Sequence, residues 1–236
     1  MQAAENSIRA ENVNIALNNN IKEIERKLEI EGTSVDIELS EAINMLELDK
    51  ERATDEKEIE KLQALIDETV RLKNDYSMYS TNVSTSGISV RGVYNPVYSP
   101  AVAAVASYFM ASGYLLSYEL LIHARDNNRL DSTYVPVYGN RIKSSAVVGR
   151  ILSNKKDISG SAAFENTGGT VERDLYYAIH NFNYSLTAKT KTITLTDRYD
   201  YASQGEYTGV AGVAIETMYI AQNMHVIVPY YVVITV

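Results

Sequence analysis

Apolar side chains recur at helical spacing in the first part of the chain. One stripe has spacings of four, three and four positions, which places its members on one face of a helix. The members are Leu17, Ile21, Ile24 and Leu28. Gly32 then interrupts the pattern and is followed by Thr33 and Ser34, two residue types that cap helix N-termini. The pattern predicts that one helix ends near Gly32 and that a second begins just after it.

A second apolar series continues at helical spacing over residues 37–72. Between residues 50 and 58 it holds only Ala53, so we expect a register change or a frayed turn there. Glu and Lys interleave on the remaining faces, as they do on solvated coiled-coil surfaces. We predict a long antiparallel helical hairpin over residues 1–79, closed near Gly32. This acidic arm either remains a solvated coiled coil, associates with itself or docks a partner helix.

Residues 99–126 are predicted to form one central helix. Ser99 can cap it, and Pro100 takes the first helical position, where proline is favoured. The first half consists of apolar and small residues and is close in length to a membrane span, whereas Glu119 interrupts the apolar run. We interpret it as a buried helix, with a membrane-inserting helix over residues 101–122 as the alternative.

The rest of the chain alternates short helices with strands. Capping residues and two-residue periodicity predict an extended piece at 134–138, a short helix capped by Ser144 or Ser145, a loop at 159–169, a helix after Thr170, a β-hairpin over 184–195, a helix at 208–224 and a final strand. Pro229 places that final strand at a sheet edge or at a bulge. We predict an α+β fold, in which a linker at 80–92 joins the arm to a compact body over 93–236 with a small, mainly antiparallel sheet flanked by helices.

Charge and tyrosine content divide the chain at the same place. Residues 1–80 hold 10 Lys and Arg against 19 Asp and Glu, whereas residues 81–236 hold 12 against 11. Of the 18 tyrosines, 16 fall in the second part. An acidic arm and a nearly neutral body offer no basic stripe for phosphate groups, so a nucleic-acid partner is not expected.

Cysteine usage and the first residues bear on the cellular compartment. The chain contains no cysteine, which excludes disulfides, thiolate metal sites and cysteine nucleophiles. It opens with MQAAENSIRAENVN, which has neither the basic start nor the apolar run of a cleavable signal peptide. A secreted protein would then leave by a route that needs no such signal, or the chain is a piece of a longer secreted protein.

The strongest candidate for chemistry is TDRYDYASQGEY, residues 196–207, at the end of a predicted strand. Asp197 and Asp200 flank Tyr199, and carboxylates placed there can converge on a divalent cation such as Mg²⁺ or Ca²⁺, or activate a water. Tyr199 can donate a hydrogen bond to a phosphoryl or carbonyl oxygen, and strand alternation points Arg198 away from it. A polar turn without chemistry is the alternative interpretation.

Three further ionisable residues are candidates to join this cluster. Glu119 and His123 lie one helical turn apart, which suits either an acid–base pair or a charged histidine held by the helix dipole. His180 ends a predicted helix and is either a cap or core residue, or a histidine recruited to the aspartates. The expected catalytic residues are Asp197, Tyr199, Asp200, His180, His123 and Glu119, with Asp197 and Asp200 as the metal ligands.

The Asp-X-Tyr-Asp pattern of Asp197, Tyr199 and Asp200 resembles the signature of the colicin M-type bacteriocins, which hydrolyse lipid II between its undecaprenyl and pyrophosphate groups. In that family a His-Arg pair follows five residues later, where this sequence has Glu206 and Tyr207. A cysteine-free helical arm before a compact α+β body is similar in layout to the secreted LXG-type toxins. These resemblances imply an antibacterial effector with an immunity protein as its partner and a lipid-linked envelope precursor as its substrate.

Two classes of function stay open at this point. The first is a secreted antibacterial toxin that hydrolyses a phosphoester or pyrophosphate bond through the Asp/Tyr cluster. The second is a non-enzymatic structural or interaction module, such as a phage or secretion-system component, that binds through its tyrosine-rich body. Toxicity that depends on Asp200 would favour the first, and oligomers that depend on residues 1–79 would favour the second.

Overall fold

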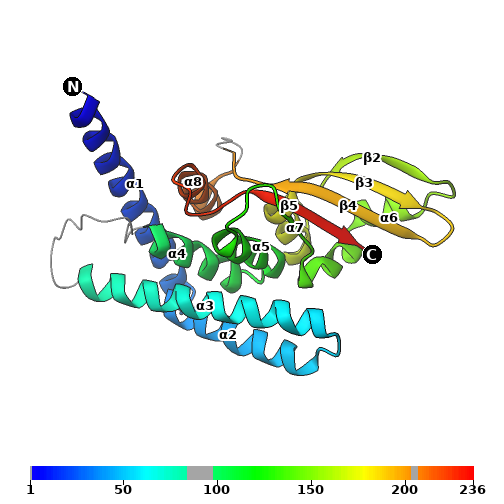
Figure 1. Ribbon diagram of the computed structural model, residues 1–236, viewed down its shortest axis with the longest axis horizontal. Helices are drawn as coiled ribbons and strands as arrows, with labels where there is room; N and C mark the ends of the chain where they lie inside the picture. The colour runs from blue at the N-terminus through cyan, green and yellow to red at the C-terminus, as the bar shows by residue number, and fades with distance from the viewer. Residues whose placement is uncertain (1, 84–97, 203–206) are drawn as a thin grey trace.

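The computed structural model describes residues 2–83, 98–202 and 207–236 and confirms the α+β architecture (Figure 1). The helices are α1 (Gln2–Ile30), α2 (Val35–Arg52), α3 (Glu56–Val83), α4 (Tyr98–Ala111), α5 (Leu115–Asp126), the 3₁₀ helix η1 (Val137–Ser144), α6 (Ala146–Leu152), α7 (Thr170–Ile179) and α8 (Gly209–Asn223). The strands are β1 (Thr133–Tyr134), β2 (Ile158–Ala163), β3 (Asn181–Thr187), β4 (Thr192–Tyr199) and β5 (Tyr230–Thr235).

The antiparallel hairpin is formed by α2 and α3, so the prediction of a hairpin closed at Gly32 is wrong. α1 does end there, because Gly32 takes a left-handed conformation with φ of 81°, and Ser34 caps α2 by accepting a hydrogen bond from the N–H of Ile37 at 3.3 Å. The hairpin instead turns at residues 53–55, where the apolar stripe is weakest. α1 leaves the hairpin and buries its own stripe against α4 and α8 (Figure 1).

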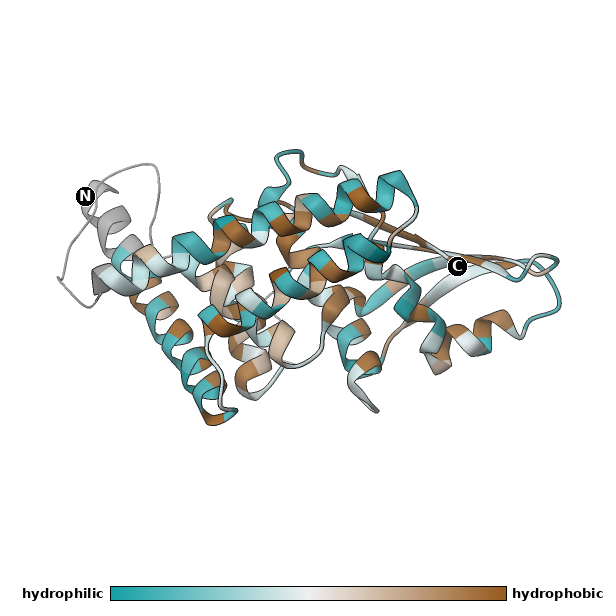
Figure 2. Cartoon of the chain, turned by 90° about the horizontal axis from the view of Figure 1, so that it is seen from below, coloured by the Kyte–Doolittle hydropathy of each residue, from teal (hydrophilic) through white to brown (hydrophobic). Residues whose placement is uncertain are grey.

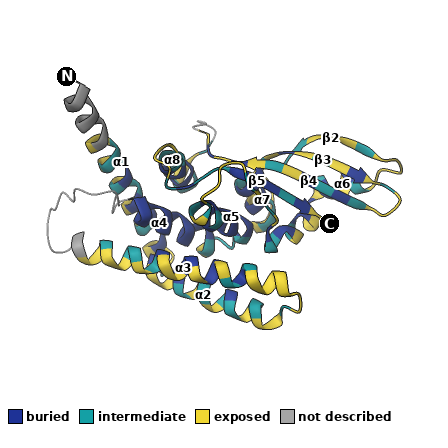
Figure 3. Ribbon diagram, viewed as in Figure 1, coloured by how far each residue is buried: buried dark blue, intermediate teal, exposed yellow. Residues whose placement is uncertain are grey.

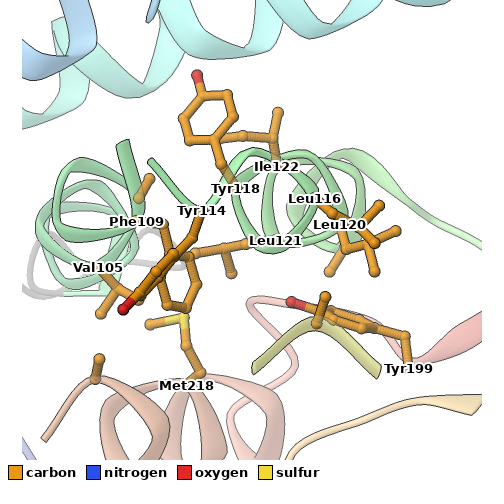
Figure 4. Close-up of a cluster of buried hydrophobic side chains, with 14 of the residues drawn as sticks. Val105, Phe109, Tyr114, Leu116, Tyr118, Leu120, Leu121, Ile122, Tyr199 and Met218 are labelled. Carbon is orange, nitrogen blue, oxygen red and sulfur yellow. The ribbon is translucent and has the colours of Figure 1, made fainter. Parts of the chain in front are cut away.

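α4 is the central helix of the molecule. Its residues 98–109 are all buried, and it contacts α1, α2, α3, α5 and α8. A helix that is apolar on every side belongs in a protein core. In Figure 4, Val105 and Phe109 of α4 meet Leu121 of α5 and Met218 of α8 in one apolar cluster.

The single helix predicted over 99–126 is in fact two helices, α4 and α5. Gly113 takes a φ of 72°, its N–H donates to the carbonyl of Met110 at 2.9 Å, and the N–H of Tyr114 donates to that of Phe109 at 2.8 Å. This glycine-based C-cap redirects the chain into α5. In the part of the chain that the structure describes, no helix is both long enough and apolar enough to cross a membrane.

The strands of the described chain form one mixed sheet in the order β1-β5-β4-β3-β2, with β1 and β5 as its parallel pair. The predicted hairpin is confirmed as β3 and β4, and the helix after it as α8. The loop predicted at 159–169 is confirmed for residues 164–169 and wrong for residues 159–163, which belong to β2. The Ser, Gly and Ala residues of β2 favour no strand by themselves, but pairing with β3 imposes one, and Tyr184 lies beside Gly160. Pro229 directly precedes β5, which is flanked on its outer side by the two residues of β1.

Buried contacts join the α2–α3 hairpin to the body. Arg125 of α5 forms ion pairs with Glu68 and Asp75 of α3, and apolar residues from both parts belong to one buried cluster. Apolar and polar positions alternate along the helices (Figure 2), and exposed residues line the outer faces of α2 and α3 (Figure 3). The first four residues of the expected linker 80–92 complete α3, and positions 84–92 lie outside the described residues.

Candidate functional site

One pocket of about 160 Å³ collects most of the predicted site residues. It lies where the C-terminal end of α7 and the last residues of β4 meet, beside α8. The predicted residues that line it are His180, Asp197, Tyr199 and Asp200. Four further tyrosines complete the wall, and these are Tyr176, Tyr177, Tyr201 and Tyr207.

Strand β4 brings Asp197 and Tyr199 to the same face of the sheet. The side chains on this face are Ile193, Leu195, Asp197 and Tyr199, because alternate residues of a strand point the same way. On the neighbouring strand β5, Asp197 lies opposite the buried Val232. Asp197 therefore occupies a position where the strand pattern calls for an apolar side chain.

Burial raises the pKa of the Asp197 carboxyl from an ordinary value of 3.8 to about 7. A hydrogen bond from the N–H of Arg198 opposes this rise, whereas the negative charge of Asp200 adds to it. Near neutral pH the carboxyl is therefore present in both its protonated and its ionised form. A group in this state can both donate and accept a proton, which is what acid–base catalysis requires.

His180 forms the C-cap of α7 in a strained backbone conformation, with φ of 30° and ψ of −80°. Two main-chain hydrogen bonds hold it there. The N–H of Phe164 donates to its carbonyl at 2.7 Å, and its own N–H donates to the carbonyl of Tyr176 at 3.2 Å. Its ring lies 4.6 Å from the ring of Tyr176, centre to centre. Residues other than glycine rarely take a positive φ, and such strain is concentrated at functional sites.

The hydroxyls of Tyr199 and Tyr201 are hydrogen-bonded to each other in the buried wall of the pocket. Burial raises the pKa of both phenols above the ordinary tyrosine value, so both stay protonated at physiological pH. One hydroxyl hydrogen is used within the pair, which leaves the other for a further acceptor. Gln222 of α8 holds this pair in place: its amide accepts from the N–H of Tyr201 at 2.9 Å and donates to the carbonyl of Tyr201 at 3.0 Å.

Asp200 is engaged by Arg198, which also donates through Nε to Asp131 at 3.2 Å. As predicted from alternation, Arg198 is exposed on the side of β4 opposite to the buried Tyr199. Within residues 2–83, 98–202 and 207–236, no three or more His, Cys, Asp or Glu side chains are grouped to hold a metal ion. The divalent cation expected at Asp197 and Asp200 stays a prediction.

Glu119 lies in another part of the core and serves to hold the chain together. It is fully buried in α5 and accepts hydrogen bonds from the Tyr134 hydroxyl at 2.7 Å, the N–H of Val137 at 2.6 Å and the N–H of Tyr138 at 2.8 Å. These bonds fix the start of η1 against α5. Burial raises the pKa of Glu119 to about 7, and the three hydrogen bonds oppose that rise.

His123, like Glu119, does not line the Asp197 pocket. Its ring stacks on Tyr134 with a centre-to-centre distance of 3.7 Å, and it lines a second pocket of about 170 Å³ with Lys61 and Glu68. Burial lowers the pKa of His123 to about 4. The imidazole is therefore neutral at physiological pH, which contradicts the interpretation of His123 as a charged residue held by the helix dipole.

Sequence reasoning missed the residues that complete the pocket. Tyr201 lies two positions after Tyr199, and continued alternation was a signal that could have identified it. Tyr176 lies one helical turn before His180, which is a weaker signal. Gln222 gave no signal, because only the packing of α8 brings it to the backbone of Tyr201, 21 residues away in the sequence.

The chain matches no protein-family model, and no curated protein and no solved structure is detectably similar to it. The resemblance to the colicin M-type signature therefore stands on Asp197, Tyr199 and Asp200. Two of these residues lie on the inner face of β4, and the third is paired with Arg198. The function has to be inferred from the chemistry of the pocket.

Proposed function

We propose that the Asp197 pocket is the active site of a hydrolase that works by general acid–base catalysis. The observation that carries this proposal is a half-buried carboxyl, with a pKa raised by burial to about 7, that lines the same pocket as His180. Histidine and carboxyl groups tuned to the working pH are the usual proton-transfer groups of enzymes. Glu119 accepts three hydrogen bonds, whereas among the described residues only the N–H of Arg198 donates to Asp197.

Each group then has a role in breaking a bond. A water molecule forms the new bond to phosphorus while the bond to the leaving oxygen breaks. Of Asp197 and His180, one takes the proton from the water and the other gives a proton to the leaving oxygen, and the Tyr199–Tyr201 hydroxyl pair donates a hydrogen bond to the oxygen on which negative charge develops. The colicin M-type resemblance favours a phosphoester or pyrophosphate bond in a lipid-linked envelope precursor such as lipid II. The chain would then act as a secreted antibacterial effector, and an immunity protein would neutralise it by covering the pocket.

Growth of bacteria that produce the chain tests this proposal. The chain is expressed once in the cytoplasm and once with an export signal, as the wild type and as Asp197→Asn, His180→Asn and Asp131→Asn. Asparagine is among the residues that best tolerate the positive φ found at His180 and Asp131. Asp131→Asn makes the same chemical change as Asp197→Asn but lies outside the pocket, so it is the matched control.

We expect the exported wild type and the control to kill, and the two pocket variants to lose activity by roughly 100-fold or more, which is what a general acid or base contributes. Thermal unfolding of each purified variant establishes that the fold is kept. Full killing by both pocket variants excludes this pocket as the active site. No killing by the wild type in either compartment refutes the toxin proposal and favours the non-enzymatic interaction module.

A further inference from the structure

The two edges of the sheet differ in how much of the backbone they leave available for a further strand. On the β5 side it ends in β1, which has two residues, whereas on the opposite side it ends in the six residues of β2. In the part of the chain that the structure describes, β2 pairs with β3 alone. It is the outermost strand in Figure 1, and its central residues are exposed in Figure 3. Unpaired backbone groups on such an edge are a template for another strand.

The pairing with β3 determines which backbone groups point to the open edge. The N–H of Phe164 donates to the carbonyl of His180, which lies opposite it in the β2–β3 register. In an antiparallel pair, alternate residues bond to the same neighbour, so Ala162, Gly160 and Ile158 also bond toward β3. The residues whose N–H and C=O groups face outward are therefore Ser159, Ser161 and Ala163.

Nothing in the composition of β2 opposes a further strand. Natural edge strands are protected by lysine, proline, inward-pointing charge or a bulge, and β2 contains no proline and no charged residue. Charges lie beside it: Lys155, Lys156 and Asp157, with a net charge of +1, are exposed just before β2, and Glu165 is exposed just after it. This polarity is complementary to itself when two copies run antiparallel, because the basic end of each strand then meets the acidic end of the other.

We propose that two copies of the chain pair through β2 about a two-fold axis and form one sheet that continues across the dimer. The outward groups belong to odd-numbered residues, so odd residues must pair with odd residues. Pairing Ser159 with Ser161 of the second copy satisfies this condition and brings the segment that carries Lys155 toward Glu165 of the second copy at both ends. Such a contact is self-complementary, as a two-fold interface requires. It does not depend on the proposed hydrolase activity.

A strand pair of this length makes a small interface compared with those of permanent dimers. We therefore expect a dimer that forms and dissociates with protein concentration. The second copy would also brace the strand whose end, at Phe164, holds the carbonyl of His180. Dimerisation would in this way stiffen one wall of the Asp197 pocket without contributing a residue to it.

Sedimentation velocity of the full chain over a range of concentrations tests the interface. Ser161→Pro removes one outward N–H and leaves the bonds to β3 intact, since proline is tolerated on the open side of an edge strand. Ser161→Ala is the matched control: both variants lose the hydroxyl bond to Asn183, but alanine keeps the N–H. We expect wild type and Ser161→Ala to reach twice the mass of the chain and Ser161→Pro to remain at the single mass. A monomeric wild type, or a proline variant that dimerises like the alanine variant, overturns the proposal.

An exchange of charges tests the antiparallel arrangement without changing the backbone. Lys155→Glu and Glu165→Lys each bring like charges toward one another at two points of the dimer, so each should weaken the dimer roughly tenfold. The double variant restores opposite charges and should recover the dissociation constant of the wild type. A double variant as weak as the single ones, or single variants as tight as the wild type, would place any dimer contact elsewhere, for example on the helical arm.

Discussion

Replacing Asp197 by asparagine is expected to make the protein more stable, and increasingly so as the pH rises. Asparagine has nearly the shape of a protonated aspartic acid and carries no charge at any pH. In the folded wild type, burial raises the pKa of the Asp197 carboxyl to about 7, whereas in the unfolded chain the same group ionises near its ordinary value of 3.8. The folded state therefore holds the proton more tightly than the unfolded state does.

The size of the effect follows from these two values. Each pKa unit between the folded and unfolded states is worth about 1.4 kcal/mol, so the whole difference amounts to about 4 kcal/mol of unfolding free energy. Because the folded pKa is the higher one, this stability is fully present below pH 3.8 and is lost as the pH rises through about 7. Between pH 5 and pH 8 the wild type should lose about 3 kcal/mol relative to Asp197→Asn.

Urea unfolding at pH 5 and pH 8 measures this difference. The chain has no tryptophan, so far-ultraviolet circular dichroism is the suitable signal. The free energy of unfolding of Asp197→Asn minus that of the wild type should grow by about 3 kcal/mol between the two pH values. Asp131→Asn, at an exposed aspartate, should show no such growth. A pH-independent difference, or a variant less stable than the wild type at pH 8, would refute a raised pKa at Asp197 and with it the acid–base proposal.

Two further predictions concern the fold. Gly113→Ala should destabilise the protein by about 1–2 kcal/mol, because the backbone φ there is 72° and the new Cβ would lie 3.1 Å from Thr170 Cγ2. Gly149→Ala, inside α6 where the new Cβ meets open space, should stabilise the protein by about 0.5–1 kcal/mol. The midpoints of urea unfolding measure both changes. A chain lacking residues 1–79 should fail to fold, because α4 would lose the α1–α3 surface that buries it. A soluble 80–236 fragment with a cooperative unfolding transition would contradict this.

Local signals in the sequence predicted those elements that local chemistry determines. Ser34 and Ser145 each cap a helix through a side-chain hydrogen bond, and alternation found the hairpin of β3 and β4. The errors arose where a distant partner decides the structure. The sequence predicts a loop at residues 159–163 because their pairing with β3 cannot be recognised from neighbouring residues. It predicts one helix in place of α4 and α5 because the apolar run continues past Gly113.

The candidate site follows the same division. Asp197, Tyr199 and Asp200 lie within four residues, so one strand end indicated all three. His180 reaches the same pocket only because α7 ends where β3 begins, beside β4. Glu119, although equally ionisable, is turned toward η1, because α5 packs between α3 and that segment. Helical spacing identifies which side chains share a face, but not what that face is packed against.

The carboxyls of the core and of the pocket differ in how the fold uses them, and this difference singles out Asp197. Asp174 accepts two backbone N–H bonds from the start of α5 and pairs with Arg141 at 2.7 Å, and Glu119 accepts three bonds around η1. Both carboxylates thus join segments of the chain that would otherwise leave polar groups unsatisfied. Asp197 is half-buried on the inner face of β4, where its carboxyl has one main-chain donor among the described residues, and it lines the same pocket as the strained His180. This difference, together with the backbone strain at His180, is the physical basis on which we propose these two residues as the proton-transfer groups.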